Sequence, residues 1–398
     1  MRSPNALQMQ TCLPKPTSTP YRIAILGSRG IPARYGGFET FAEQLALGLV
    51  QAGVEVTVFA EGDSSADSAA FDYQGIRVEP VRTRRLGPAT TLLYDTMCLW
   101  RARRGFDIVY MLGYGAAFAC WIPRCWGAVV WVNMDGLEWA RSKWRPVARG
   151  YLRAMEACMA RVATRVLADA QAIQRYYQQR YPKGAPSTFI PYGAHLPAVN
   201  APDDLSAQLQ AWQLIPDGYL LIVARMEPEN HILEMLQAYS AVAASVSMPL
   251  IVVGEYRADN AYCARLRDFT HQEGIRFIGP VYDAAALTAL RRGAWAYLHG
   301  HSVGGTNPSL LEAMACANFV IAHDNPFNRE VLGEHALYFS TSSDLSTLLQ
   351  GFSSLNHTRS RHQQAVCNRV QTAYSWSSVV GAYLALMAQD VPHRKEGA

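Results

Sequence analysis

The chain has 398 residues, half of them apolar and only 17% charged, which is typical of buried α/β domains and excludes a disordered chain. This length exceeds one ordinary hydrophobic core and predicts two domains. The net charge of +4 is unevenly distributed, because residues 1–195 carry 23 Lys and Arg against 14 Asp and Glu. A basic N-terminal half favours an anionic partner, with a merely solubilising surface as an equal alternative.

Three features of the sequence indicate where in the cell the protein is expected: its leader, its apolar stretches and its cysteines. Residues 1–20 are rich in Pro, Ser and Thr and lack the apolar run of a signal peptide, so we expect a loose leader. The most apolar stretch, Gly115–Val132, carries Pro123 and Arg124 at its middle, which disfavours a transmembrane helix and favours a short helix followed by a strand. The eight cysteines form no C-x-x-C pair, which favours reduced thiols in the cytosol.

Strands, glycine-rich turns and helices alternate in two series, which predicts two parallel sheets covered by helices. A break with three prolines, residues 190–204, separates the two series, and we expect domains over residues 21–195 and 196–374. The helix expected at 375–389 should cross back onto the first domain, so that the stretch 375–398 completes it. The expected strands are Tyr21–Leu26, Val54–Ala60, Ile108–Leu112, Val129–Asn133, Tyr219–Ala224, Pro249–Gly254, Ile275–Gly279, Ala294–Leu298 and Phe319–Ala322.

The turn after the first strand, Gly27–Phe41, is the first candidate site, because ligands of doubly wound sheets bind beyond the carboxyl ends of strands. Gly36 and Gly37 stand immediately before a helix, where backbone N–H groups can approach an anion or a sugar, and Glu39 belongs to the same loop. A tight turn packed against the other domain is the alternative. The loop lacks G-x-G-x-x-G, which argues against a nicotinamide-dependent oxidoreductase.

Arg225 directly follows the strand Tyr219–Ala224. A guanidinium at the carboxyl end of a buried strand is well placed to bind a phosphate group and to stabilise a phosphate leaving group. A surface arginine without a role is the alternative.

The segment His299–Ala315 (HGHSVGGTNPSLLEAMA) is the most specific of the turns. Pro308 is expected to open a helix, so backbone N–H groups at its start are candidates for holding a diphosphate. Glu312, one turn later, is a candidate acceptor for ribose hydroxyls or else merely offsets the helix dipole. His299 and His301 lack a third ligand and predict no metal site. The candidate donor-binding residues are Gly304, Gly305, Thr306, Asn307, Ser309, Leu310 and Glu312.

The segment Val129–Trp144 runs from a buried strand into Asp135 and Glu138. Polar acceptors beside aromatic rings are typical of sugar-binding sites, and we interpret both carboxylates as candidate catalytic or acceptor-binding residues. Trp139 and Trp144 fit either such a site or the core of the following helix.

Basic residues gather in three clusters of the N-terminal half, namely 82–85, 101–104 and 141–153. The apolar segment Thr91–Trp100 lies beside two of them, and we expect its apolar groups to be exposed. This pattern favours docking on an anionic membrane surface, with arginines spread around the domain as the alternative.

These motifs resemble the retaining GT-B glycosyltransferases of family 4, and more closely their bacterial rhamnosyltransferase branch, which builds capsule and cell-wall polysaccharides. The resemblance rests on GSRGIPARYGGFETF, MDGLEWARSKW and HGHSVGGTNPSLLEAM, together with IPYGA at Ile190 and ARMEPEN at Ala224. It covers residues 21–383.

The resemblance implies two facing Rossmann-like domains with an interdomain cleft. It implies transfer of L-rhamnose from dTDP-rhamnose to a saccharide on a polyprenyl diphosphate, at the inner face of the cytoplasmic membrane. The implied partners are the nucleotide-sugar co-substrate, the acceptor and the membrane surface. We expect no nucleic-acid partner, no metal ion and no further cofactor. A UDP- or GDP-hexose donor and a non-catalytic assembly protein on the same scaffold remain as alternatives.

The chain departs from the broad family at two positions. The family's donor segment usually has two glutamates separated by seven residues; Glu312 fits the second, whereas Gly304 stands at the first. The family usually has a lysine five residues after the phosphate-binding arginine, and here that position is Asn230. Both departures are typical of the rhamnosyltransferase branch.

Overall fold

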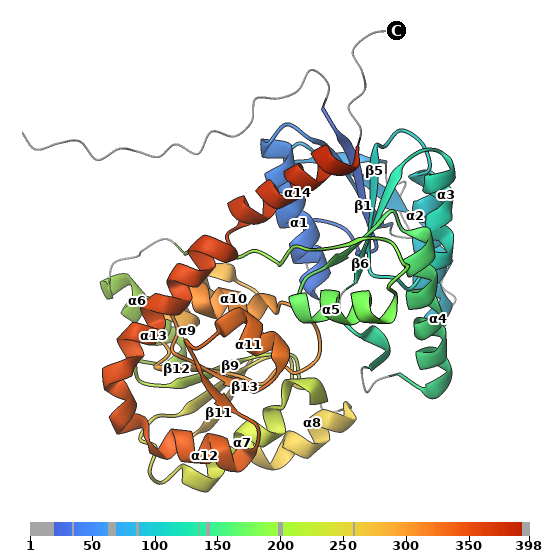
Figure 1. Ribbon diagram of the computed structural model, residues 1–398. Coiled ribbons are helices and arrows are strands. Elements are labelled where there is room, and N and C mark those ends of the chain that lie inside the picture. The colour runs from blue at the N-terminus through green and yellow to red at the C-terminus, as the bar shows by residue number, and fades with distance from the viewer. Residues whose placement is uncertain are drawn as a thin grey trace, which may run out of the picture.

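A computed structural model describes residues 20–33, 36–62, 69–84, 87–134, 136–140, 144–197, 202–257 and 259–391. The chain folds into two α/β units, each a sheet with helices on both faces (Figure 1). The fold class expected from the alternation of strands and helices is therefore confirmed.

The N-terminal sheet has eight strands in the order β3-β4-β2-β1-β5-β6-β7-β8, and the described pairs are parallel except for β3 with β4. The strand order reverses between β1 and β5, which creates a crevice at their carboxyl ends. The strands are β1 (Arg22–Leu26), β2 (Glu55–Glu61), β3 (Phe71–Tyr73), β4 (Ile76–Val81), β5 (Ile108–Leu112), β6 (Val129–Met134), β7 (Arg165–Ala168) and β8 (Ser187–Phe189). The helices are α1 (Gly36–Gln51), α2 (Thr90–Arg101), α3 (Trp121–Cys125), α4 (Pro146–Val162) and α5 (Gln171–Arg180).

The C-terminal sheet is parallel, with the order β11-β10-β9-β12-β13-β14 and a reversal between β9 and β12. Its strands are β9 (Leu220–Val223), β10 (Leu250–Val253), β11 (Ile275–Gly279), β12 (Ala296–His299), β13 (Val320–His323) and β14 (Leu337–Phe339). Its helices are α6 (Pro202–Leu209), α7 (Ile232–Val242), α8 (Ala261–Leu266), α9 (Ala284–Gly293), α10 (Pro308–Ala315), α11 (Pro326–Leu332), α12 (Ser342–Gln350) and α13 (Phe352–Ala373).

The central strands of both sheets are buried on their two faces, so they are almost continuous apolar runs, whereas outer strands such as β3, β4 and β8 carry polar residues and are partly exposed. The stretch Gly115–Val132 forms the short helix α3 and the strand β6. Within the described residues, no helix is long and apolar enough to cross a membrane.

The last helix, α14 (Trp376–Asp390), returns to the N-terminal unit and lies along α1, as the red and blue helices of Figure 1 show. The Tyr383 hydroxyl lies 2.9 Å from that of Tyr110 on β5. Asp390 accepts hydrogen bonds from Trp131 at 2.9 Å and from Arg165 at 2.7 and 2.5 Å. The nearly buried ion pair with Arg165 and the hydrogen bond from Trp131 fix the C-terminal end of α14 to β7 and β6.

The chain passes between the units twice, before α6 and again between α13 and α14. The two connecting segments contact each other. The Ala194 N–H donates to the Tyr374 carbonyl at 2.8 Å, and Ala194 forms an isolated parallel bridge with Ser375. The two crossings therefore lie side by side.

Candidate functional site

A cleft of about 1290 Å³ lies between the two units, at the switch points of both sheets. Gly27–Arg29 after β1 and Gly113–Gly115 after β5 form one wall; Ala224–Glu227 after β9 and Gly300–His301 after β12 form the other. A pocket for a single drug-sized ligand measures about 300–1,000 Å³, so this cleft exceeds one such pocket and has room for two smaller ones.

Arg225 lies on the C-terminal wall with an exposed side chain. Within the described residues its guanidinium makes no ion pair, which leaves it available to an anionic ligand. Asn230 shapes the loop, because its side-chain amide donates to the Arg225 carbonyl at 2.7 Å and its oxygen lies 2.7 Å from His301 Nδ1. The residue at the family's lysine position thus ties the β9 loop to the β12 loop.

In the turn before α10, some of the residues expected to bind the nucleotide-sugar donor are placed differently from the prediction. The Asn307 side chain caps the helix by accepting from the N–H groups of Ser309 at 2.9 Å and Leu310 at 3.4 Å. These two N–H groups were expected to face a diphosphate, but the cap already occupies them. The Leu310 side chain is fully buried and does not line the cleft. Residues 304–307 do line it, as does Ser309.

Glu312 has a partner that the sequence did not reveal. Its carboxylate lies 2.5 Å from Arg291 on α9, and the Arg291 side chain is only 4% exposed against 43% for Glu312. Arg291 also donates to the Ser309 hydroxyl at 3.2 Å. Glu312 is therefore the counter-ion of a buried cation and also part of the cleft wall, which goes beyond a helix-dipole role.

The glycine turn of the N-terminal unit faces the other domain. A Cβ atom on Gly37 would lie 3.7 Å from Pro308, so this residue lines the cleft and also packs across it. Glu39 lines the cleft and accepts the Arg29 N–H at 3.0 Å, which closes the β1 loop. Gly36 begins α1.

The two tryptophans of the segment after β6, Trp139 and Trp144, donate to different carboxylates. Glu138 lines the cleft and accepts from the Trp144 indole at 3.0 Å. Trp139 instead donates to the buried Glu156 at 2.8 Å and packs against the core. Both rings are half-buried and pack against the core, and of the two Trp144 lines the cleft. Asp135 lies outside the described residues.

Close contacts join the two units at the end of the cleft. The Thr306 hydroxyl donates to the Asp169 carbonyl, across from one unit to the other. A Cβ on Gly305 would lie 2.0 Å from the Asp169 carboxylate, and one on Gly136 would lie 2.8 Å from Gly304 Cα. Only glycine permits this approach, so the units are closed against each other here.

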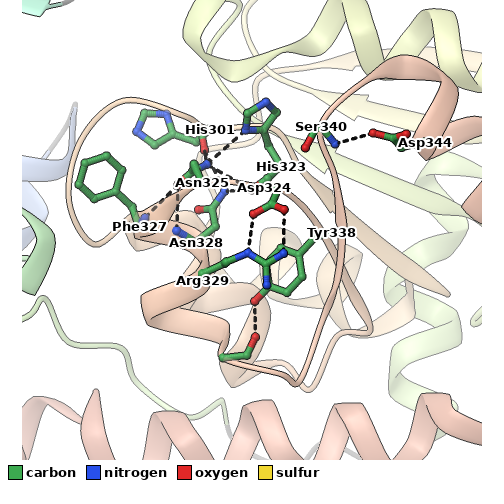
Figure 2. A network of polar contacts seen from close by, with 11 residues as sticks. His301, His323, Asp324, Asn325, Phe327, Asn328, Arg329, Tyr338, Ser340 and Asp344 are labelled. Atoms are coloured by element: carbon green, nitrogen blue, oxygen red, sulfur yellow. Dashed lines mark hydrogen bonds and ion pairs between the residues drawn. The ribbon is translucent and has the colours of Figure 1, made fainter.

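The histidine-rich loop after β12 is held by hydrogen bonds from two asparagines at the start of α11, as Figure 2 shows. Asn325 and Asn328 each donate to the His301 carbonyl at 3.0 Å. His299 lines the cleft, and burial lowers its pKa to about 3, so the ring is neutral at pH 7. The described residues contain no group of three His, Cys, Asp or Glu that could hold a metal ion.

Two doubly wound units that face each other across a cleft, with the last helix returning to the first unit, define the GT-B fold. Residues 217–355 match a family described as glycosyl transferases group 1, and residues 21–195 match a domain of unknown function, DUF1972. The C-terminal unit thus contains a glycosyltransferase group 1 domain.

The chain is similar to one protein named as a sugar transferase and to two solved structures that share its fold. The chain is 31% identical over 141 residues to the O-antigen chain mannosyltransferase B of Escherichia coli, and spans about a third of that protein's length, since the match covers 34% of this chain and 36% of the relative. Sucrose-phosphate synthase of Thermosynechococcus elongatus superposes with a TM-score of 0.75 at 18% identity, over 93% of this chain and 98% of that one. Anabaena HepE in complex with UDP and glucose superposes with a TM-score of 0.71 at 16% identity, over 93% and 100%.

Proposed function

We propose that the protein is a glycosyltransferase that moves a sugar from a nucleotide-sugar donor to a saccharide acceptor during bacterial surface polysaccharide synthesis. The observation that carries the proposal is Arg225, an exposed cation at the β9 switch point of an interdomain cleft with room for two substrates. The glycosyltransferase group 1 domain and the mannosyltransferase relative support it.

The donor diphosphate binds on the C-terminal wall in this proposal, between Arg225 and the turn 304–307. As the sugar–phosphate bond breaks, negative charge develops on the diphosphate, and a preorganised guanidinium stabilises it by several kcal/mol. This charge stabilisation needs no metal ion, and Glu312 remains the candidate for the ribose hydroxyls. Retention of configuration follows from the family resemblance.

The preferred donor is dTDP-rhamnose, from the resemblance of the three long motifs to the rhamnosyltransferase branch. The mannosyltransferase relative favours a second candidate, a UDP- or GDP-linked hexose. Mass spectrometry of the products from a panel of sugar nucleotides with lipid-linked saccharides separates the two.

The acceptor in this proposal is a saccharide on a polyprenyl diphosphate, and the protein acts at the cytoplasmic face of an anionic membrane. Support comes from the surface formed by α2, the 3₁₀ turn Ala117–Cys120, α3 and α4. It exposes about half of each of three tryptophans, whereas its two acidic residues, Asp95 and Glu156, are buried. The tryptophans are Trp100, Trp121 and Trp126, and the exposed arginines are Arg101, Arg104, Arg124, Arg145, Arg153 and Arg161.

The structure corrects one detail of this membrane surface. The segment Thr91–Trp100 was expected to be exposed, but Tyr94, Cys98 and Leu99 are buried on the core side of α2, leaving Trp100 as its large exposed apolar residue. Tryptophan is enriched at membrane interfaces, and each Lys or Arg near an anionic surface adds about 1 kcal/mol.

Substitution of Arg225 tests the transferase proposal directly. Arg225→Ala should lower turnover by roughly a hundredfold or more, as loss of an oxyanion-stabilising donor does. The matched control is Arg361→Ala, an exposed arginine on α13 outside the cleft, which should retain activity. Activity of the Arg225 variant within about threefold of wild type would remove Arg225 from the mechanism.

A further inference from the structure

We propose that Asp95 and Glu61 form an acceptor subsite, in which their carboxylates accept hydrogen bonds from hydroxyl groups of a neutral sugar. The inference rests on the proposed function and adds the residues that recognise the acceptor. The sequence motifs that predict the sugar-binding site include neither residue, and Asp95 belongs only to the apolar segment Thr91–Trp100.

Both carboxylates stand on the N-terminal wall, opposite Arg225. Glu61 ends β2 and is exposed, and Asp95 lies on α2, where Thr91, Tyr94 and Asp95 all line the cleft. Tyr94 donates to the Ser28 carbonyl at 3.2 Å, which holds this part of α2 against the β1 loop. The two acids therefore lie at the carboxyl edge of the N-terminal sheet, where a ligand of a doubly wound domain binds.

Asp95 is an incomplete hydrogen-bonding group. It is only 5% exposed, and its Oδ1 atom has no hydrogen-bond partner among the residues that the structure describes. Burying a polar atom without a hydrogen-bond partner is unfavourable, so such a group in a cleft calls for a partner. A ligand in the cleft is the partner that the position of Asp95 allows.

The electrostatics restrict what that ligand is. Burial, and then the nearby Glu61, raise the pKa of Asp95 to about 7. Two neighbouring carboxylates repel a phosphate, and they are not part of any three-residue group able to hold a metal among the described residues. Sugar hydroxyls donate to carboxylates without adding charge, and Trp144 lines the same cleft with an aromatic ring.

Among the described residues, the titratable groups that interact with Asp95, apart from Glu61, have pKa values raised by burial and stay neutral at pH 7. They are Tyr94 and Cys98 on α2, Cys120 in the 3₁₀ turn before α3, and Tyr151 on α4. A pH dependence of acceptor binding near neutrality therefore reports on Asp95.

The test measures sugar binding separately from nucleotide binding. Saturation-transfer NMR with methyl mannoside, methyl glucoside and methyl rhamnoside, in saturating UDP or dTDP, reports on the acceptor half. Asp95→Asn preserves the side-chain shape and should lower the glycoside signal at least tenfold. Glu61→Gln, at an exposed position, should lower it severalfold without risk to folding. Glu55→Gln, at the exposed opposite end of β2, is the matched control and should behave as wild type.

The pH dependence provides a second readout. The wild-type signal should rise between pH 6 and 8 as the carboxylate ionises, and the Asp95→Asn signal should stay flat. Nucleotide affinity measured by calorimetry should be unchanged in all variants, and its absence in wild type would overturn the proposed function instead. Unchanged glycoside binding in both carboxylate variants, or none in wild type, would overturn the subsite.

Discussion

Replacing Glu312 by Gln should destabilise the C-terminal unit, because it removes the counter-ion of a buried cation. Arg291 is 4% exposed and lies 2.5 Å from the Glu312 carboxylate. The helix α10 begins at Pro308 with or without the charge of Glu312, so the fold should persist and the loss of stability should come from the ion pair.

The magnitude follows from the unequal burial of the two partners. Breaking a fully buried pair costs about 3–5 kcal/mol, and breaking an exposed pair costs about 0–1 kcal/mol. Glu312 is 43% exposed, so water reaches it, and the amide oxygen of Gln still accepts from Arg291. We expect a loss of about 2 kcal/mol, which lowers Tm by about 4–8 °C for a unit of this size.

Differential scanning calorimetry measures the loss, with the exposed Glu334→Gln as the control that should leave Tm unchanged. Nucleotide affinity should fall as well if Glu312 also binds ribose. The double variant Arg291→Met with Glu312→Leu removes both charges and should recover most of the stability while nucleotide binding stays weak. An unchanged Tm in Glu312→Gln would refute the role of the ion pair.

Four further outcomes are expected. Gly305→Ala should prevent full closure of the cleft, because its Cβ would lie 2.0 Å from Asp169, and small-angle scattering with UDP should show a more open shape than wild type. Anionic liposomes should bind the protein at low salt and release it as salt rises, and Trp121→Ala with Trp126→Ala should weaken this binding; equal binding to neutral liposomes would contradict it. Turnover should survive EDTA; loss of activity that Mg²⁺ restores would contradict metal independence. The raised pKa of Asp95 disfavours its ionised form in the fold, so the stability gained by Asp95→Asn should grow as pH rises from about 4 to about 7, measured as Tm, and a constant gain would be inconsistent with that cause.

Sequence patterns predicted most strands of the two sheets, but of the site they predicted only the residues that directly follow a strand. The long apolar runs predicted their strands to within about two residues, since a strand buried on both faces is apolar throughout. The hairpin β3–β4 and the strands β7, β8 and β14 were missed, because three to six residues give too little periodicity.

The polar residues of the site were harder to place. Arg225 and residues 304–307 follow strands directly, so their position in the cleft could be inferred. Arg291 could not, because its burial depends on packing between α9 and α10, and its sequence neighbourhood resembles an exposed helix end. Asp95 was hidden in the same way, because the buried face of α2 is set by its packing against β1, β4 and α3.

The paired crossings between the units have a mechanical consequence. Two covalent connections at separate points would lock the domains against rotation, but Ala194 and Ser375 bridge each other, so both connections share one pivot. A rotation about this pivot would leave both sheets and the Asp390 contacts intact. It would separate Gly136 from Gly304 and Gly305 from Asp169, and so would open the cleft to substrates while each wall kept its shape.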